Sequence, residues 1–234
     1  MIKKAMILAA GFGKRIQPLT LRCPKPLLKL RGDTLLFNTI KFLELSGIEQ
    51  VVINVHYLRD QIIDYVNKNK FNLHIKIVEE KEKILDTGGG VLNAIKYFAN
   101  DPFIIINPDT LWSSPYLKEL ESMEKIFFEN TKNKCLLLVV SKEKSFDKSF
   151  RGDFSLQNHL ISRKDKKNLS LIYTGLQIIK PEVFSGLKNE VFSINQIWDK
   201  LILRNELYGM KSNIDFIHVS SLNIYNNLLK KFKH

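Results

Sequence analysis

Two glycines and two cationic residues follow the first apolar run of the sequence. Residues 5–9 read AMILA, and Gly11, Gly13, Lys14 and Arg15 come soon after them. Backbone N–H groups at a point where a strand turns toward a helix can surround an anion, and glycine lets a phosphate approach them closely. Lysine adds positive charge there, and an arginine can bind two phosphate oxygens at once. The segment therefore predicts a phosphate-binding loop.

Two well-known phosphate-binding loops fit this segment poorly. A dinucleotide-binding loop needs a third glycine, in the pattern G-x-G-x-x-G, and an acidic residue about 20 residues later at the end of a second strand. Here the third glycine is missing, and Asp33 lies in an expected turn. A P-loop needs the pattern G-x-x-x-x-G-K-[ST], which GFGKRI does not contain. We therefore set both alternatives aside.

The order of these residues resembles the signature of a known family. LAAGFGKRIQPLT, followed by CPKPLL, is similar as a unit to the segments L-A-A-G-x-G-x-R, P-L-T and P-K-P-L of the sugar-1-phosphate nucleotidyltransferases. The resemblance implies that Arg15 neutralises the end of a nucleoside triphosphate that leaves as pyrophosphate. It places Lys25 between the nucleotide and the sugar phosphate. It also implies that four residues of the loop wrap the nucleotide, namely Ala10, Gly11, Gly13 and Lys14.

A second glycine-rich segment and a later acidic residue extend the resemblance to about residues 3–230. KILDTGGGVLNAI resembles the loop with which the family binds the base, so Thr87, Gly88 and Gly89 are expected to contact the nucleotide. PFIIINPDTLW places Asp109 just after a buried strand, where the family binds Mg²⁺, an ion that takes few carboxylates together with waters and phosphates. The usual family pattern is N-G-D, and Pro108 removes one N–H group that could have contacted the nucleotide.

Two later segments resemble the sugar-binding side of the family. SFRGDFSL is similar to a stretch of the N-acetylmuramate-1-phosphate uridylyltransferases, which implies that Gly152 and Asp153 contact the sugar. TGLQIIKPEVF matches a later strand of the family, which implies that Thr174 and Gly175 lie near the sugar phosphate.

One position departs from the family at the expected metal site. The family has a second metal-binding aspartate in a V-D-V-G-T-like segment before the last helix, and FIHVSSLNIY places His218 there. Imidazole suits softer divalent ions better than Mg²⁺. The metal is then held by Asp109 with the phosphates, or by Asp109 and His218 with Mn²⁺, or only weakly. A histidine that serves packing or hydrogen bonding is the other interpretation.

The elements that must position these residues alternate along the chain, which is typical of βαβ units around a mainly parallel sheet. Apolar runs predict strands at residues 5–9, 51–55, 72–80, 102–107 and 135–141. Helical spacing predicts helices at residues 34–47, 58–70, 88–99, 114–128, 181–187, 193–205 and 221–233, with Asp33 or Thr34 as the first N-cap. From about residue 142 the pattern favours antiparallel strands, within residues 142–157 and at 159–163 and 169–179.

We expect one nucleotidyltransferase domain over residues 1–234, in the α/β class. The predicted fold is Rossmann-like and GT-A-like: a mixed, mainly parallel central sheet flanked by helices, with a small antiparallel sugar-binding extension. Residues 1–141 form the nucleotide-binding half, and residues 142–234 form the sugar-binding half with a closing helix.

Composition narrows the classes of function. The 234 residues carry a net charge of +12, but the lysines are spread along the chain, so we expect attraction of small polyanions and no nucleic-acid partner. No apolar run approaches the roughly 18–20 residues that span a bilayer, so we expect no membrane contact. Cys23 and Cys135 lack a metal-type spacing. We expect a cytoplasmic protein that is a monomer or a homodimer.

The resemblance implies an enzyme that joins a nucleoside triphosphate to a sugar 1-phosphate and releases pyrophosphate. Arg15, Lys25 and Asp109 are the expected catalytic residues, and Mg²⁺, or else Mn²⁺, is the expected cofactor. UTP with N-acetylmuramate 1-phosphate, or a similar hexose 1-phosphate, is the expected substrate pair. A mannose-1-phosphate guanylyltransferase is the nearest alternative, followed by a cytidylyltransferase. Pro108 and His218 leave open a nucleotide-binding homologue with impaired catalysis, and a basic nucleic-acid binder ranks last.

Overall fold

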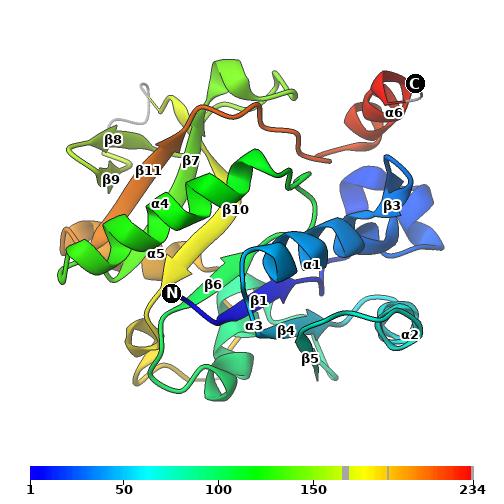
Figure 1. Cartoon of the computed structure of the whole chain (residues 1–234), viewed down its shortest axis with the longest axis horizontal. Coiled ribbons are helices and arrows are strands. Elements are labelled where there is room, and N and C mark those ends of the chain that lie inside the picture. Colours follow the sequence, from blue (N-terminus) through cyan, green and yellow to red (C-terminus); the bar gives the residue numbers. More distant parts are fainter. Residues whose placement is uncertain (165–168, 189, 233–234) are drawn as a thin grey trace.

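The computed structural model describes residues 1–164, 169–188 and 190–232. Within them, nine strands form one sheet in the order β5-β4-β1-β6-β10-β7-β11-β9-β8 (Figure 1). In chain order these strands are β1 Lys4–Leu8, β4 Gln50–Val55, β5 His74–Glu79, β6 Phe103–Ile106, β7 Cys135–Ser141, β8 Ser155–Gln157, β9 Leu160–Ser162, β10 Leu171–Ile179 and β11 Leu207–Ser212. A separate two-stranded hairpin consists of β2 Lys29–Leu30 and β3 Asp33–Thr34.

Most strands of the large sheet run in one direction. β5, β4, β1 and β6 are parallel neighbours, and β7 is parallel to β11. β10 is antiparallel to β6 and β7, and β9 is antiparallel to β11 and β8. Helices connect the parallel strands, because a parallel pair needs a crossover connection. The structure thus confirms the mixed, mainly parallel sheet, and the β8–β9 hairpin is an antiparallel extension at its edge.

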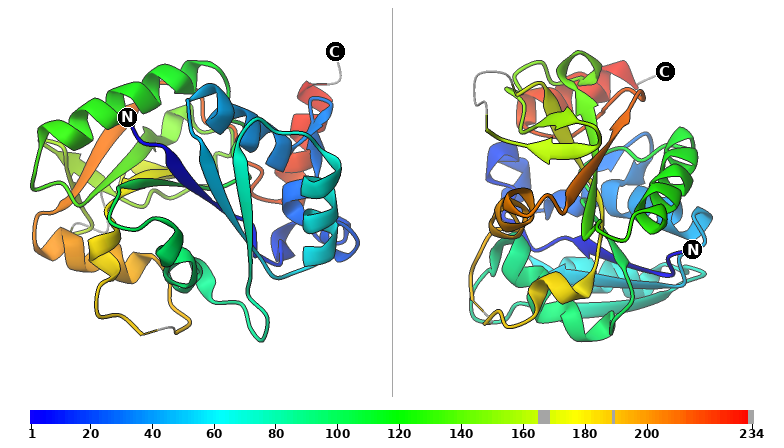
Figure 2. Two further views of the ribbon diagram at one scale, coloured as in Figure 1. Left: turned by 60° about the horizontal axis from the view of Figure 1, so that its bottom comes forward. Right: turned by 90° about the vertical axis from the view of Figure 1, so that its left-hand side faces the viewer.

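Helices cover both faces of this sheet. α1 Leu35–Leu45, α2 Arg59–Lys68 and α4 Pro115–Glu129 pack on one face. α3 Asp86–Ala94 and α5 Asn195–Leu203 pack on the other, and the left view of Figure 2 shows the strands between the two helix layers. Because each central strand is buried on both faces, its sequence is a continuous apolar run, as in the predicted strands.

Local chemistry explains where α1 and α4 begin. The Thr34 hydroxyl accepts a hydrogen bond from the backbone N–H of Phe37 at 3.0 Å, which confirms the predicted N-cap of α1. Pro115 occupies the first turn of α4, where a missing N–H costs nothing. In the part of the chain that the structure describes, no helix has both the length and the apolar character needed to cross a membrane.

The last helix, α6 Leu222–Lys231, packs against the first loops and not against the sheet. Tyr225 and Leu228 are buried together with Ile16 and Leu30, and the Tyr225 hydroxyl donates to the carbonyl of Lys29 at 2.8 Å. Figure 1 shows α6 in red beside the blue β3. The predicted closing helix is therefore confirmed, although residue 233 lies outside the described residues.

Some elements differ from the predictions. Strand β11 was not predicted, because its sequence LYGMKS contains a glycine and a lysine that weaken the strand pattern. Gly209 is needed there, since a Cβ at this position would lie 2.5 Å from the side chain of Ile161 in β9. Helix α3 begins at Asp86 instead of Gly88, and within residues 181–187 the structure has only a 3₁₀ turn at Pro181–Phe184.

Candidate active site

A pocket of about 390 Å³ lies where three neighbouring parallel strands end. β1 leads into the glycine loop, β4 contributes Asn54, the residue before its last residue Val55, and β6 leads into Asn107, Pro108 and Asp109. In open α/β sheets, ligands bind at the carboxyl ends of the strands. Segments that lie far apart in the sequence therefore meet in this lining, because the strands before them are neighbours in the sheet.

The glycine loop lines this pocket as predicted. Ala10, Gly11, Gly13, Lys14 and Arg15 all belong to the lining. Gly13 has a φ of +62°, and a Cβ there would lie 2.9 Å from the side chain of Thr20 and 3.3 Å from that of Lys25. The Thr20 hydroxyl donates to the carbonyl of Gly13 at 2.9 Å, which fixes the turn.

An ionic cluster lies at the end of the pocket that Lys25 and Asp109 line. Lys25 forms an ion pair with Oδ2 of Asp109, and Nε2 of His218 lies 3.1 Å from the same oxygen. Backbone pairing brings His218 there, because Val219 N–H donates to the Asp109 carbonyl at 2.8 Å and Leu111 N–H donates to the Ile217 carbonyl at 2.8 Å. The structure therefore joins three residues that lie far apart in the sequence.

The surroundings of Asp109 favour its ionised form. Burial would raise the pKa of the Asp109 carboxyl, but the charges of His218 and Lys25, and their hydrogen bonds, outweigh burial. The pKa of Asp109 therefore lies well below its usual value. A negative charge at this position is retained at neutral pH.

One oxygen of Asp109 remains available for a cation. Oδ1 of Asp109 is buried without a hydrogen-bond partner among the described residues, and the same holds for Nδ1 of His218. Over the same residues, no group of three or more His, Cys, Asp or Glu side chains could hold a metal by itself. Mg²⁺ in nucleotide enzymes typically takes one or two carboxylates, with waters and phosphates as its other ligands. The residues present fit an ion of that kind, held largely by a bound substrate.

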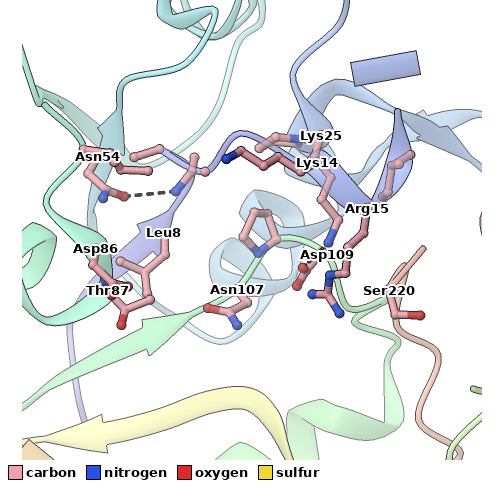
Figure 3. Close-up of a pocket in the computed structure, with 18 residues that line it drawn as sticks. Leu8, Lys14, Arg15, Lys25, Asn54, Asp86, Thr87, Asn107, Asp109 and Ser220 are labelled. Carbon is pink, nitrogen blue, oxygen red and sulfur yellow. Dashed lines mark hydrogen bonds and ion pairs between the residues drawn. The ribbon is translucent and has the colours of Figure 1, made fainter. Parts of the chain in front are cut away.

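Figure 3 shows that the pocket has two chemically different ends. Arg15, Lys25 and Asp109 lie at one end. Asn54 and Thr87 lie at the other end, and Asn107 lies between the two. Asp86 lies beside Thr87, so the second end is polar and carries a carboxylate. A cationic end and a polar hydrogen-bonding end suit a ligand with a polyanionic group and a flat polar group.

The second glycine segment is placed differently from expectation. Thr87 lines the pocket, and its hydroxyl accepts a hydrogen bond from Ile194 N–H at 2.9 Å. The N–H groups of Gly88 and Gly89 instead donate to the carbonyl of Phe192, at 2.9 and 3.0 Å. A Cβ on Gly88 would lie 2.3 Å from the Phe192 ring. The structure thus uses these two glycines for close packing, and the predicted contact with the base has no counterpart in the pocket lining.

A second pocket, of about 380 Å³, adjoins the first one. It shares Asp86, Thr87 and Asn107 with the first lining and adds residues from the C-terminal half. These added residues are Asp153, Arg163, Tyr173, Gln177, Ser193, Ile194, Asn195 and Trp198. Two adjoining pockets provide room for two small ligands that meet near Asn107.

Of the four predicted sugar-binding residues, the structure brings only Asp153 into this second lining. Thr174 is buried, and its hydroxyl donates to the Leu138 carbonyl at 2.9 Å. Gly175 has a φ of +93° and packs on the Asn107 side chain, where a Cβ would be 2.9 Å from the Asn107 Cβ. Gly152 packs on the carbonyl of Leu169, so its contribution is to hold the turn before Asp153.

Several lining residues were not predicted. Asn54 and Asn107 are polar residues within or directly after buried apolar strands, and that contrast is a signal the sequence offers. Arg163 gives no such signal, because it is one of many basic residues in its region. Its guanidinium lies 4.4 Å from the centroid of the Phe154 ring, and its Nη1 donates to Asp199 at 2.9 Å.

Comparisons with known proteins identify the family of this chain. The family model described as nucleotidyl transferase matches residues 4–150. The N-acetylmuramate alpha-1-phosphate uridylyltransferase of Caulobacter vibrioides is 28% identical over 93% of this chain and 91% of its own length. The D-glycero-alpha-D-manno-heptose 1-phosphate guanylyltransferase of Aneurinibacillus thermoaerophilus is 27% identical, with 99% of each chain covered.

A solved structure supports the fold. The inositol-1-phosphate CTP transferase from T. maritima superposes with a TM-score of 0.77 at 19% identity, and the match covers 100% of this chain and 97% of that one. The predicted fold class is therefore confirmed. Together with the match of the family model over most of the sequence, this shows that the chain belongs to the nucleotidyl transferase family, as one of its sugar-1-phosphate nucleotidyltransferases.

Proposed function

We propose that the chain transfers a uridylyl group from UTP to N-acetylmuramate 1-phosphate, or to a similar hexose 1-phosphate. The observation that carries this proposal is the pair of adjoining pockets, one with a cationic end and one lined by Asp153. Asp153 belongs to the segment that resembles the N-acetylmuramate-1-phosphate uridylyltransferases, and a relative of that name matches over 91% of its length. A guanylyltransferase relative matches over a similar span, so the choice between UTP and GTP is decided by the assay below.

The proposed reaction is an in-line displacement at the α-phosphorus of UTP. An oxygen of the sugar 1-phosphate forms the new bond to this phosphorus, and the bond from phosphorus to the oxygen bridging toward the β-phosphate breaks. The electron pair of that bond leaves with pyrophosphate. Such a reaction needs alignment and charge neutralisation more than covalent help from the protein.

The chain's own residues divide this work by position. The glycine loop and Arg15 would hold the triphosphate, since they form the cationic end of the first pocket. Lys25 would balance the charge that spreads over the phosphates in the transition state. Asn54 and Thr87 mark the other end of the pocket, where the base would lie.

A divalent cation would be held by Asp109, through its unpartnered Oδ1, with His218 beside it. Such an ion, when bound, neutralises phosphate charge. His218 suits Mn²⁺ better than Mg²⁺, so we expect activity to be higher with Mn²⁺ relative to Mg²⁺ than in a His218→Asp variant.

The experiment is a pyrophosphate-release assay with UTP, GTP and CTP against N-acetylmuramate 1-phosphate, mannose 1-phosphate and glucose 1-phosphate. The proposal predicts turnover with UTP and N-acetylmuramate 1-phosphate, and a product whose mass is that of the UDP-sugar. Lys25→Ala should lower kcat/KM by about 10²-fold, a typical loss for a group that stabilises transition-state charge. Lys29→Ala, an exposed lysine outside the pocket lining, is the matched control and should retain activity.

Two results would contradict the proposal in different ways. Turnover only with GTP and mannose 1-phosphate would keep the reaction and replace the substrates. Tight nucleotide binding without pyrophosphate release from any pair, unchanged by His218→Asp, would indicate a homologue that has lost catalysis.

A further inference from the structure

A buried hydrogen-bonded chain links the two loops that line the first pocket. Asn54 and Glu80 are 3% and 2% exposed. Oδ1 of Asn54 accepts a hydrogen bond from Ala9 N–H at 3.0 Å, and Nδ2 of Asn54 donates to Oε1 of Glu80 at 2.7 Å. Oε2 of Glu80 accepts from Leu85 N–H at 2.7 Å. This series of hydrogen bonds therefore connects the start of the glycine loop to the start of α3.

The donors at both ends fix the direction of this chain. Backbone N–H groups at Ala9 and Leu85 can only donate, so Asn54 must turn its oxygen toward Ala9 and its NH₂ group toward Glu80. Both oxygens of Glu80 then act as acceptors. A glutamine at position 80 would have to place a donor against a donor at one of its two contacts.

Burial of the Glu80 carboxylate costs free energy of folding, because the group loses its contact with water. None of the ion pairs formed by the described residues includes Glu80, so no cation compensates for this buried carboxylate. The surroundings are also closed, because a Cβ on Gly90 would lie 2.8 Å from both Asn54 Nδ2 and Glu80 Oε1. Glu80 does not line the pocket, whereas Ala9, Asn54, Asp86 and Thr87 do.

We propose that Asn54 and Glu80 are positioning residues that hold the glycine loop and the start of α3 at the separation a nucleoside triphosphate requires. Glu80 acts through the backbone at Leu85 and through Asn54, without touching the nucleotide. The inference rests on the proposed function only in that the first pocket holds the nucleotide. Ala9 precedes the loop that would hold the triphosphate, and Leu85 precedes Asp86 and Thr87 at the base end.

The test uses an exchange of the two side-chain groups. Glu80→Gln alone and Asn54→Asp alone each place two donors or two acceptors against one another. The double variant Glu80→Gln/Asn54→Asp restores every contact. In it, the new amide at position 80 donates to the new carboxylate at position 54 and accepts from Leu85 N–H, while that carboxylate accepts from Ala9 N–H. Glu119→Gln is the control, since Glu119 accepts from the Ser212 hydroxyl at 3.1 Å away from this pocket.

The first readout is hydrogen exchange of the Ala9 and Leu85 amides, which does not depend on any substrate. Each single variant should speed exchange of both amides at least about tenfold, roughly the loss of one net hydrogen bond. The double variant should restore protection, and Glu119→Gln should not alter it. Unchanged protection in the single variants, or protection still lost in a folded double variant, would overturn the inference.

The second readout is the KM for UTP in the assay with N-acetylmuramate 1-phosphate. The single variants should raise the KM for UTP about tenfold or more, with a smaller change in the KM for the sugar phosphate, and the double variant should recover. Equal changes in both KM values would contradict a nucleotide-positioning role. If the wild type turns over no UTP, the proposed substrate pair fails, and the exchange readout still decides whether the two residues hold the loops.

Discussion

At the scale of single residues, the carboxylate of Asp109 connects the ionic cluster at the cationic end of the pocket. Asp109 balances Lys25 and His218 through one oxygen and leaves the other without a partner among the described residues. The charge of Lys25 beside the carboxylate would by itself weaken metal binding. A bound triphosphate would draw Lys25 toward its own oxygens, because it carries more charge than Asp109 does. Substrate and cation are therefore expected to bind cooperatively at this site.

A second buried carboxylate, Asp147, supports the segment that carries His218. Asp147 accepts hydrogen bonds from Ser149 N–H at 2.9 Å, from the Ser149 hydroxyl at 2.6 Å and from the Ser220 hydroxyl. Burial would raise the pKa of Asp147, but these bonds and the charge of His218 outweigh it and lower the pKa. Because the folded chain lowers this pKa, ionised Asp147 stabilises the fold above about pH 4, and that contribution is lost as the pH falls through the lowered value.

Asp147→Asn should therefore lower the free energy of unfolding at pH 7 by roughly 1–3 kcal/mol. The difference from the wild type should shrink as the pH falls below about 4 and then through the lowered pKa of folded Asp147, below which both side chains are neutral. Urea unfolding at several pH values measures it. Asp64→Asn, at an exposed position of α2, is the control and should change stability by less than about 0.5 kcal/mol. A difference that grows toward low pH would refute this assignment.

At the scale of elements, glycines in the two glycine-rich segments have different structural roles. Gly11 lines the pocket, and a Cβ there would meet no atom of the described residues within 4 Å. A Cβ on Gly89 would lie 2.3 Å from the carbonyl oxygen of Glu190. A methyl group is thus tolerated by the fold at Gly11, where it occupies space for a ligand, and is rejected by backbone packing at Gly89.

Gly89→Ala should lower the free energy of unfolding by about 1–3 kcal/mol, the usual cost of overpacking. Gly11→Ala should leave stability within about 0.5 kcal/mol and should raise the KM for UTP, since the methyl group would stand where a phosphate approaches the backbone. Thermal unfolding and steady-state kinetics on both variants measure the contrast. Equal stability losses at the two positions would show that the loops are not built as described.

Particular residues show how far sequence reasoning reaches at this scale. The glycine loop, Lys25 and Asp109 could be singled out from the sequence, because each carries a local pattern next to an apolar strand, and the structure brings them into one pocket lining. The contact between Asn54 and Glu80 could not be predicted, since it depends on the parallel register of β4 and β5. The packing role of Gly88 and Gly89 could not be predicted, because ligand approach and close packing both select glycine. Only the positions of Phe192 and Glu190 in the structure distinguish the two causes.

At the scale of the whole molecule, one sheet joins the two halves of the chain, residues 1–141 and 142–234. β10, from the C-terminal half, lies between β6 and β7 of the N-terminal half. Each of the two large apolar cores also contains residues from both halves. Both halves therefore contribute strands to one sheet and side chains to both cores, which supports the expectation of one domain over residues 1–234.

This sharing predicts a single cooperative unfolding transition. Trp112 lies in one core and Trp198 in the other, and they are the two tryptophans of the chain. Trp112→Phe and Trp198→Phe variants let fluorescence report on one core at a time during urea unfolding. Within each variant, the fluorescence midpoint should coincide with the midpoint from circular dichroism. Separate midpoints would indicate two units that unfold independently.

The central claim is that the pocket beside β1, β4 and β6 binds a nucleoside triphosphate with its phosphates at the cationic end and its base at the opposite end. A crystal structure of the chain with UTP and Mg²⁺ tests it most directly. The account predicts the triphosphate against the glycine loop and Arg15, with the uracil near Asn54 and Thr87. UTP bound in another pocket, or with its triphosphate remote from both Arg15 and Lys25, would contradict it.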